Sequence, residues 1–394
     1  MFFLSAAEHS GDALGAAVIP ALRSRFPDAQ FVGVGGEAMA RAGCRLLANP
    51  TVHSAMLLGA ASQAFYWYRL LGKIKAEFSA NRPAVVMPID SPAIHLKLAK
   101  MAKQAGLPVC YYVAPQLWAW GAWRMKKLAD ACDTVCCVLP FEEEYFRRFS
   151  VHAVYVGHPM FDVPADDLGG DAPAAPLAPI EPPLPTSGAK MALLPGSRSA
   201  EIDGNLPVML RVITEANGRL GKCSFVIAAA SEARAWQIRR HLRHFNLPVD
   251  IRVGMTDAVI QWADVVLVVS GTATLQVAKH GKAMIVMYYL APWKWLPVGQ
   301  FLVKTRYRAL VNILAGRRVA PEYIPFYGSP APLARDAVAL LSQPQLREDM
   351  GAQLREVVSA LGPGPDGRSA AARVAAEVAK LVGTPDELAD NETE

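Results

Sequence analysis

Apolar runs alternate with helix-length segments along most of the chain. In 83–90 (PAVVMPID) and 263–271 (ADVVLVVSG), consecutive positions are apolar rather than every second one. Such strands are buried on both faces, as in parallel sheets that helices cover on each side. The sequence therefore predicts an α/β fold. Beyond the strand-like start MFFLSAAE, the predicted strands are 31–36, 83–90, 108–115, 133–140, 153–159, 190–198, 223–230, 249–255, 263–271 and 282–289.

A proline-rich segment, 161–188, interrupts this alternation and is incompatible with a helix or a central strand. The 394 residues also exceed the usual size of a single core. We therefore expect two Rossmann-like parallel-sheet domains facing each other across a cleft. The expected divisions are an N-terminal domain (1–160), a linker (161–188), a C-terminal domain (189–362) and a terminal helix with a frayed tail (363–394). That helix packs either on the first domain or on a second subunit, so a monomer and a homodimer both remain open.

Composition narrows the class of protein. Apolar residues make up 52% and charged residues 19%, which supports a large core. A formal charge of +5 fits an anionic substrate or lipid surface and is too small to indicate nucleic acid. The six cysteines lack paired CxxC spacing, so buried cysteines are expected rather than a metal site, and no cofactor is predicted. Without a signal sequence or a membrane-spanning run, the expected location is the cytoplasm.

Two turns in the second half end apolar strands and precede helices. One contains Ser270, Gly271 and Thr272, and the other contains Gly196, Ser197 and Arg198. Helix N-termini present unpaired N–H groups and a positive dipole, glycine permits close backbone approach, and arginine matches a phosphate. Together the turns predict a nucleoside-diphosphate site, with Gln276 within reach of ribose hydroxyls. For either turn alone, a turn that binds nothing is the alternative.

Polar residues also follow strands of the first half. After MFFLSA, the residues Glu8, Ser10, Gly11 and Asp12 form either a polar floor for a hydroxyl-rich substrate or a helix cap. Asp90 emerges from the apolar run VVMPI. Partial burial would raise its pKa and make it an effective general base near neutral pH, whereas helix capping is the structural alternative.

Two aromatic segments suggest contact with lipid or sugar. Residues 55–78 place apolar and aromatic side chains beside cations, which is typical of a helix at a membrane interface, although such a helix also suits the cover of a sheet. The residues concerned are Leu58, Phe65, Trp67, Tyr68, Arg69 and Lys73. The segment 111–124 is predicted to be a loop that contacts sugar or acyl groups.

The motifs taken together resemble the lipid-A-disaccharide synthase family, in order and over nearly the whole chain. They are AEHSGD (7–12), VGVGGEAMARAG (32–43), PIDSP (88–92), YYVAPQLWAW (111–120), LPFE (139–142), VGHPM (156–160), LLPGSRSAEI (193–202), SGTATLQ (270–276) and NILAGRR (312–318). The resemblance implies the GT-B glycosyltransferase fold. It also implies transfer of diacylglucosamine from UDP-2,3-diacylglucosamine to 2,3-diacylglucosamine 1-phosphate, at the inner face of the cytoplasmic membrane, without a metal.

The resemblance also implies residue roles. Asp90 becomes the base, Arg198 with its turn and the 270–272 turn hold the diphosphate, and Asn312 lies near the nucleotide. Glu8, Ser10 and Asp12 line the sugar site. The family pattern has a second aspartate and an aromatic where Ala93 and Ile94 stand, and a glutamate where Gln276 stands. Ala93 puts a paired-carboxylate mechanism in doubt but leaves Asp90 intact, whereas Gln276, without charge assistance, is expected to weaken binding of UDP. A UDP-N-acetylglucosamine 2-epimerase and a nucleotide-sugar-binding protein without catalysis remain the alternatives.

Overall fold

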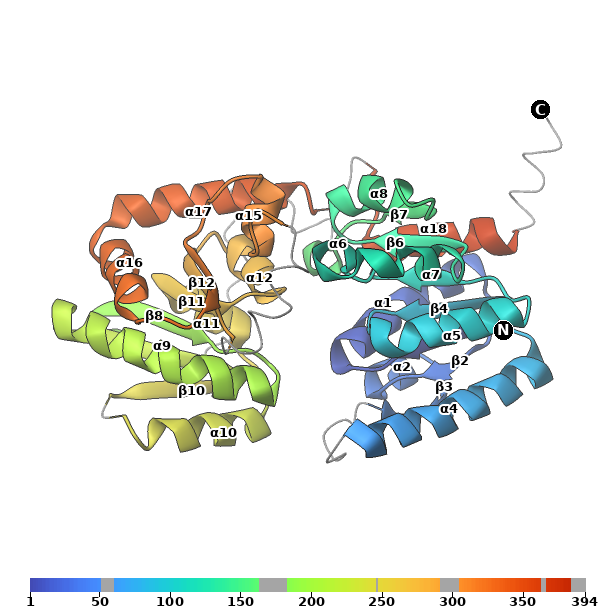
Figure 1. Cartoon of the computed structure of the whole chain (residues 1–394), viewed down its shortest axis with the longest axis horizontal. Coiled ribbons are helices and arrows are strands. Elements are labelled where there is room, and N and C mark those ends of the chain that lie inside the picture. Colours follow the sequence, from blue (N-terminus) through green and yellow to red (C-terminus); the bar gives the residue numbers. More distant parts are fainter. Residues whose placement is uncertain (51–59, 163–182, 246, 291–304, 363–365, 384–394) are drawn as a thin grey trace. The chain divides into compact units, whose positions relative to one another are not determined.

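The computed structural model describes residues 1–50, 60–162, 183–245, 247–290, 305–362 and 366–383. The chain divides into two compact units (Figure 1). Unit 1 comprises Met1–Ala165 and Leu361–Glu394, and unit 2 comprises Asp166–Ala360. Each unit is built on a parallel sheet, which confirms the predicted pair of Rossmann-like sheets. Most of the predicted linker 161–188 lies outside the described residues.

Unit 1 contains a seven-stranded sheet in the order β3-β2-β1-β4-β5-β6-β7, with parallel neighbours throughout. The strands are β1 (Phe2–Ala6), β2 (Phe31–Val34), β3 (Cys44–Ala48), β4 (Val85–Ile89), β5 (Cys110–Tyr112), β6 (Thr134–Cys137) and β7 (Ala153–Tyr155). Every residue of the central strands β1 and β4 is buried. Their unbroken apolar sequences are thus explained by helices on both faces.

Unit 2 contains a six-stranded parallel sheet in the order β10-β9-β8-β11-β12-β13. The strands are β8 (Ala189–Leu194), β9 (Cys223–Ala229), β10 (Val249–Val253), β11 (Val265–Val269), β12 (Ala283–Tyr289) and β13 (Glu322–Phe326). The predicted strands all appear in the two sheets. Two edge strands, β3 (CRLLA) and β13 (EYIPF), were not predicted, because polar residues and Pro325 interrupt their apolar runs.

Helices connect successive strands in each unit. In unit 1 they are α1 (His9–Arg25), α2 (Glu37–Arg41), α4 (Ala60–Asn81), α5 (Pro92–Gln104), α6 (Leu117–Trp120), α7 (Met125–Ala129), α8 (Pro140–Arg147) and α18 (Ala370–Val382). The C-terminal helix α18 packs on α1. The carboxylate of Asp162 accepts the Ala370 N–H at 2.8 and 2.9 Å, which fixes where that helix begins.

In unit 2 the helices are α9 (Ser199–Leu220), α10 (Glu232–Leu242), α11 (Thr256–Trp262), α12 (Ala273–Lys279), α15 (Leu310–Ala315), α16 (Ala331–Ser342) and α17 (Pro344–Ser359). Within the described ranges, no helix is long and apolar enough to cross a bilayer.

Both sheets reverse their strand order at one place. In unit 1 the reversal lies between β1 and β4, and in unit 2 it lies between β8 and β11. In such sheets ligands bind beyond the carboxyl ends of the strands at the reversal. These two edges are therefore where functional side chains are to be sought.

Candidate functional site

The reversal edge of unit 1 brings two predicted segments together. Ala6 pairs with Ile89 at the ends of β1 and β4, so residues 8–12 and Asp90 leave the same edge of the sheet. Gly11 fits closely there, because a Cβ at this position would lie 3.3 Å from that of Ala6. Glu8 and Ser10 are exposed at this edge.

Asp12, predicted to line the sugar site, instead binds the backbone of its own unit. Its buried carboxylate accepts N–H groups from Gly36 at 2.6 Å, Ala38 at 3.0 Å and Met39 at 3.1 Å. These are unpaired donors at the start of α2, and a carboxylate satisfies them well. Asp12 therefore holds α2 against α1, and its oxygens face the protein rather than a ligand.

Asp90 stands in a strained stretch of backbone. It has φ 54°, Ser91 has φ 47°, and Val113, which follows the neighbouring strand β5, has φ 62°. Left-handed conformations cost a residue with a Cβ on the order of 1–2 kcal/mol each. Such strain persists where surrounding contacts enforce it, and it concentrates at functional sites.

A buried network of hydrogen bonds to the Asp90 carbonyl stabilises this conformation. The oxygen accepts the Tyr111 hydroxyl at 2.6 Å and lies 2.6 Å from Nδ1 of His95. Because a carbonyl only accepts, Nδ1 must carry the proton. Burial lowers the pKa of His95 to about 4, so Nε2 is bare near neutral pH and accepts the Ser5 hydroxyl at 3.0 Å. The network thereby crosses from β1 through α5 to the end of β4.

The aromatic segment 111–124 is not the predicted loop, because it includes α6, a 3₁₀ turn (Ala122–Arg124) and the strand β5. Buried Trp118 donates its indole N–H to Glu142 Oε1 at 2.8 Å. Burial raises the pKa of Glu142 to about 7, although bonds from Trp118, Leu139 and Val138 oppose this shift. Trp123, in contrast, is 62% exposed.

The reversal edge of unit 2 places the two predicted turns side by side, because β8 and β11 are neighbours. Gly196 has φ 109°, a conformation that favours glycine. The N–H groups of Ser197 and Arg198 are already occupied, since each donates to Glu201 Oε2 at 3.2 Å. The Arg198 guanidinium lies 3.6 Å from the same carboxylate and is largely exposed. A diphosphate at this turn would therefore meet the arginine side chain first.

The 270–272 turn begins the short helix α12, as predicted. Ser270 donates its hydroxyl to the Arg308 carbonyl at 3.3 Å, whereas Thr272 is exposed. Gln276 donates to Asp257 at 3.0 Å, and the same carboxylate oxygen lies 2.7 Å from His280 Nε2. These bonds lower the pKa of Asp257, with the His280 bond as the largest cause. The uncharged amide of Gln276 is therefore accompanied by the carboxylate of Asp257, which was not predicted.

Asn312 is completely buried, and both ends of its amide are engaged. Nδ2 donates to the Ala320 carbonyl and to Glu322, and Oδ1 accepts the N–H groups of Val319 and Ala320. With two donors and two acceptors used, the side chain organises its own loop. Asn312, which was predicted to lie near the nucleotide, therefore supports its loop and has no amide group left to bond a ligand.

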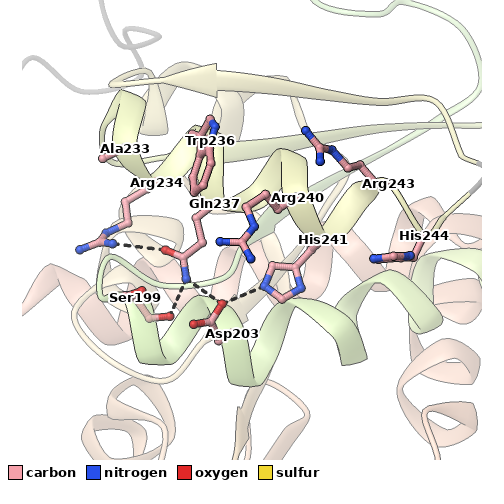
Figure 2. A pocket seen from close by; sticks show the side chains of 10 residues that line it. All are labelled: Ser199, Asp203, Ala233, Arg234, Trp236, Gln237, Arg240, His241, Arg243 and His244. Carbon is pink, nitrogen blue, oxygen red and sulfur yellow. Dashed lines mark hydrogen bonds and ion pairs between the residues drawn. The ribbon is translucent and has the colours of Figure 1, made fainter.

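A cavity of about 740 Å³ adjoins the 196–198 turn, between α9 and α10 (Figure 2). Arg234 donates to the Ser197 carbonyl at 3.1 Å and to Gln237 at 3.2 Å. Gln237 and His241 both contact Asp203. Burial would raise the pKa of this carboxyl, but the bonds from these two side chains and the nearby cations together hold the pKa below its usual value. The polar groups along this wall are thus largely bonded to each other.

The residues assigned to the membrane divide into two groups. Leu58 lies outside the described residues. Along α4, Phe65 and Tyr68 are 62% and 77% exposed, with the Arg69 guanidinium 5.9 Å from the Phe65 ring, and Lys73 is exposed. Trp67 is half-buried against the core beside β1, so it covers the sheet rather than extending the exposed face.

Sequence reasoning missed residues whose effect depends on distant partners. Nothing in the local sequence indicates that His95 and Tyr111 bond the Asp90 carbonyl, or that Ser5 bonds His95. Asp257 and Glu322 likewise act on segments far along the chain. Glu201 was detectable, because a glutamate three residues into a helix commonly bonds back to the N-terminal backbone.

Comparison with known families places this geometry in context. A family model described as lipid-A-disaccharide synthetase matches residues 2–373. A lipid-A-disaccharide synthase of Syntrophus aciditrophicus is 32% identical over 94% of this chain and 96% of its own length. One from Anaeromyxobacter dehalogenans is 35% identical over 95% of each.

Solved structures with similar folds share little sequence with this chain. MurG of Acinetobacter baumannii is 13% identical, with a TM-score of 0.55 over 96% of this chain and 99% of its own. The UDP-GlcNAc 2-epimerase of Neisseria meningitidis, bound to UDP-GlcNAc, is 10% identical, with a TM-score of 0.57 over 92% and 99%. At such identities the likeness establishes the two-domain GT-B type of fold alone.

The network around Asp90 predicts an unusual histidine. In ¹⁵N spectra of histidine-labelled protein, His95 should carry its proton on Nδ1 and remain neutral at pH 5. Because folding lowers its pKa from 6.5 to about 4, the folded state binds this proton more weakly than the unfolded chain. The associated stability, on the order of 3 kcal/mol, is present above pH 6.5 and lost as the pH falls toward 4. A proton on Nε2 at neutral pH, or titration near 6.5, would contradict the network.

Proposed function

The chain belongs to the lipid-A-disaccharide synthetase family and is a glycosyltransferase of lipid A biosynthesis; from that premise we propose its reaction and the residues that perform it. It transfers diacylglucosamine from UDP-2,3-diacylglucosamine to 2,3-diacylglucosamine 1-phosphate. The acceptor 6-hydroxyl oxygen bonds to the anomeric carbon while the bond from that carbon to UDP breaks. The hydroxyl proton passes to a base, and UDP leaves with the bonding electrons.

Asp90 is the base in this proposal. The observation that carries it is the fixed, half-buried position of Asp90 at the reversal edge of unit 1, where two donors hold its carbonyl. A base must meet the attacking hydroxyl within hydrogen-bond reach, so a rigid backbone favours the reaction. Glu8 and Ser10 leave the same edge and supply polar groups for the sugar. Ser5, His95 and Tyr111 act as positioning residues.

Unit 2 stabilises the departing diphosphate. Negative charge develops on UDP as the glycosidic bond breaks, and a preorganised cation lowers the barrier. Arg198 supplies this charge, and the exposed Thr272 adds a hydroxyl on the adjacent turn. The Glu201 carboxylate is the present partner of Arg198, and a diphosphate would compete with it. Gln276 and Asp257 together offer an amide and a carboxylate to ribose hydroxyls.

Membrane contact is the second part of the proposal, because both substrates carry acyl chains. The exposed aromatic side chains of Phe65 and Tyr68, with Arg69 and Lys73 beside them, fit an interface in which rings enter the lipid and cations meet anionic headgroups. The buried stripe Leu70, Ile74 and Phe78 anchors the same helix on unit 1. One helix thus has an inner face for the core and an outer face for lipid.

The role of Asp90 is tested by single-turnover transfer with the wild type and Asp90→Asn. We expect disaccharide from the wild type and a loss of about 10²-fold or more in the variant, since the amide cannot take the proton. Similar rates would remove Asp90 from its role. UDP binding by the wild type without product would instead favour a binding protein, and conversion of UDP-GlcNAc without an acceptor would favour an epimerase.

The competition at the 196–198 turn predicts opposite effects on UDP affinity. Arg198→Ala should weaken binding at least 10-fold, because a charge-assisted contact is lost. Glu201→Gln should strengthen it, because the amide still accepts N–H groups but no longer repels a diphosphate. Calorimetric titration with UDP measures both, with Arg219→Ala, at the far end of α9, as the control. Weaker binding by Glu201→Gln would contradict the competition.

The proposed membrane face predicts that Phe65→Ser/Tyr68→Ser lowers binding to vesicles containing phosphatidylglycerol by at least 5-fold, without a change in thermal stability. Burial of the apolar area of each exposed ring in the lipid contributes on the order of 1 kcal/mol or more to membrane binding. Trp236→Ser is the matched control, because Trp236 is also exposed and has Arg240 5.0 Å from its ring, in unit 2. Equal loss in the control, or unchanged sedimentation with vesicles, would refute the assignment.

A further inference from the structure

A second cavity, of about 800 Å³, lies in unit 1 between the outer face of α5 and the 3₁₀ turn and helix α7 that follow the aromatic segment. We call it the α5–α7 groove. Figure 1 locates both helices within that unit. Its lining includes Leu96, Lys97, Lys100, Trp123, Arg124 and Lys127. Trp123 and Arg124 belong to the segment 111–124, which the sequence predicts to contact sugar or acyl groups, whereas the other four are not among the predicted site residues.

The groove begins next to the proposed base. Pro92 and Ala93, two and three residues after Asp90, line one end, and Gln104 lines the other. The 13 residues of α5 span roughly 20 Å, so the groove follows the whole helix away from the sheet edge. Ala93, Lys97 and Lys100 recur at helical spacing and are all exposed, so one face of α5 forms a continuous wall.

Charge and apolar surface are combined in this wall. Five cations and a single carboxylate, Asp130, line the cavity, and Lys103 pairs with Asp133 at 2.6 Å. In the described part of the chain, Lys97, Lys100 and Lys127 form no ion pair. The ring of Trp123 has Arg124 at 4.6 Å and Lys127 at 5.8 Å, while Leu96, Ala93 and Ala131 contribute apolar surface.

We propose that the α5–α7 groove binds the phosphate-bearing acyl sugar that accepts the transferred residue. Lysine and arginine side chains meet its phosphate, and the stems of the lysines with Leu96 and Trp123 cover the start of an acyl chain. The acceptor is the occupant because its hydroxyl must reach Asp90, from which the groove extends. This inference rests on the proposed reaction and names the acceptor site within it.

Kinetics provide the first test. Lys100→Gln/Lys127→Gln should raise the KM for 2,3-diacylglucosamine 1-phosphate at least 10-fold, with kcat and the KM for the UDP-sugar changed less than 2-fold. Lys126→Gln is the matched control, because Lys126 is exposed on α7 beside Lys127 but does not line the groove. An equal effect of the control, or a fall in kcat alone, would overturn the proposal.

Binding provides the second test, independent of catalysis. Trp123 emission, taken as the difference between the wild type and Trp123→Phe, should respond to the acceptor in neutral detergent micelles and at least 10-fold more weakly to the same lipid without phosphate. Equal responses to both lipids, or a response to phosphatidylglycerol vesicles alone, would overturn an acceptor site. A phosphate-dependent response in a protein that forms no disaccharide would reject the proposed reaction and leave a phospholipid-sugar site in place.

Discussion

The reversal of strand order at the centre of each sheet is the constraint on which the rest of the structure depends. Crossovers between parallel strands are right-handed, so the chain leaves β1 and β4, or β8 and β11, toward opposite sides. Their carboxyl ends diverge and leave polar turns uncovered by a helix. Residues about 80 positions apart, such as Ser10 and Asp90, thereby reach one edge. The functional chemistry of each unit follows from this arrangement.

The two edges use their buried polar groups differently. In unit 1, His95 and Tyr111 bond the Asp90 carbonyl and Ser5 bonds His95. These bonds offset the strain of two successive left-handed residues and fix the backbone of the proposed base. In unit 2, Glu201 accepts the N–H groups of Ser197 and Arg198 at the turn. One edge is therefore preorganised around the backbone of Asp90, and the other around the Glu201 carboxylate, with which a diphosphate would compete in the proposed reaction.

Patterns along the chain predicted the central strands, the turns that end them and the family, because each depends on neighbouring residues. The edge strands β3 and β13 were not predicted, since their mixed composition gives no apolar run. The hydrogen bonds of Asp12 and Asn312 to backbone groups were not predicted for a different reason. A polar residue after a strand has the same sequence signature whether it faces a ligand or the backbone of another loop, and only the fold decides between these.

In unit 1, the proposed base Asp90 lies next to the cationic groove that is the proposed site of the acceptor phosphate. A carboxylate that must accept a proton works best where its substrate is held by groups that do not disturb it, and the cations of the α5–α7 groove extend away from Asp90 along the helix. Alanine at position 93 contributes to this separation, because an aspartate there would place a second negative charge beside both the base and a bound phosphate. Alanine at this position thus has a physical consequence. It leaves no carboxylate at position 93, between Asp90 and the lysines of the groove.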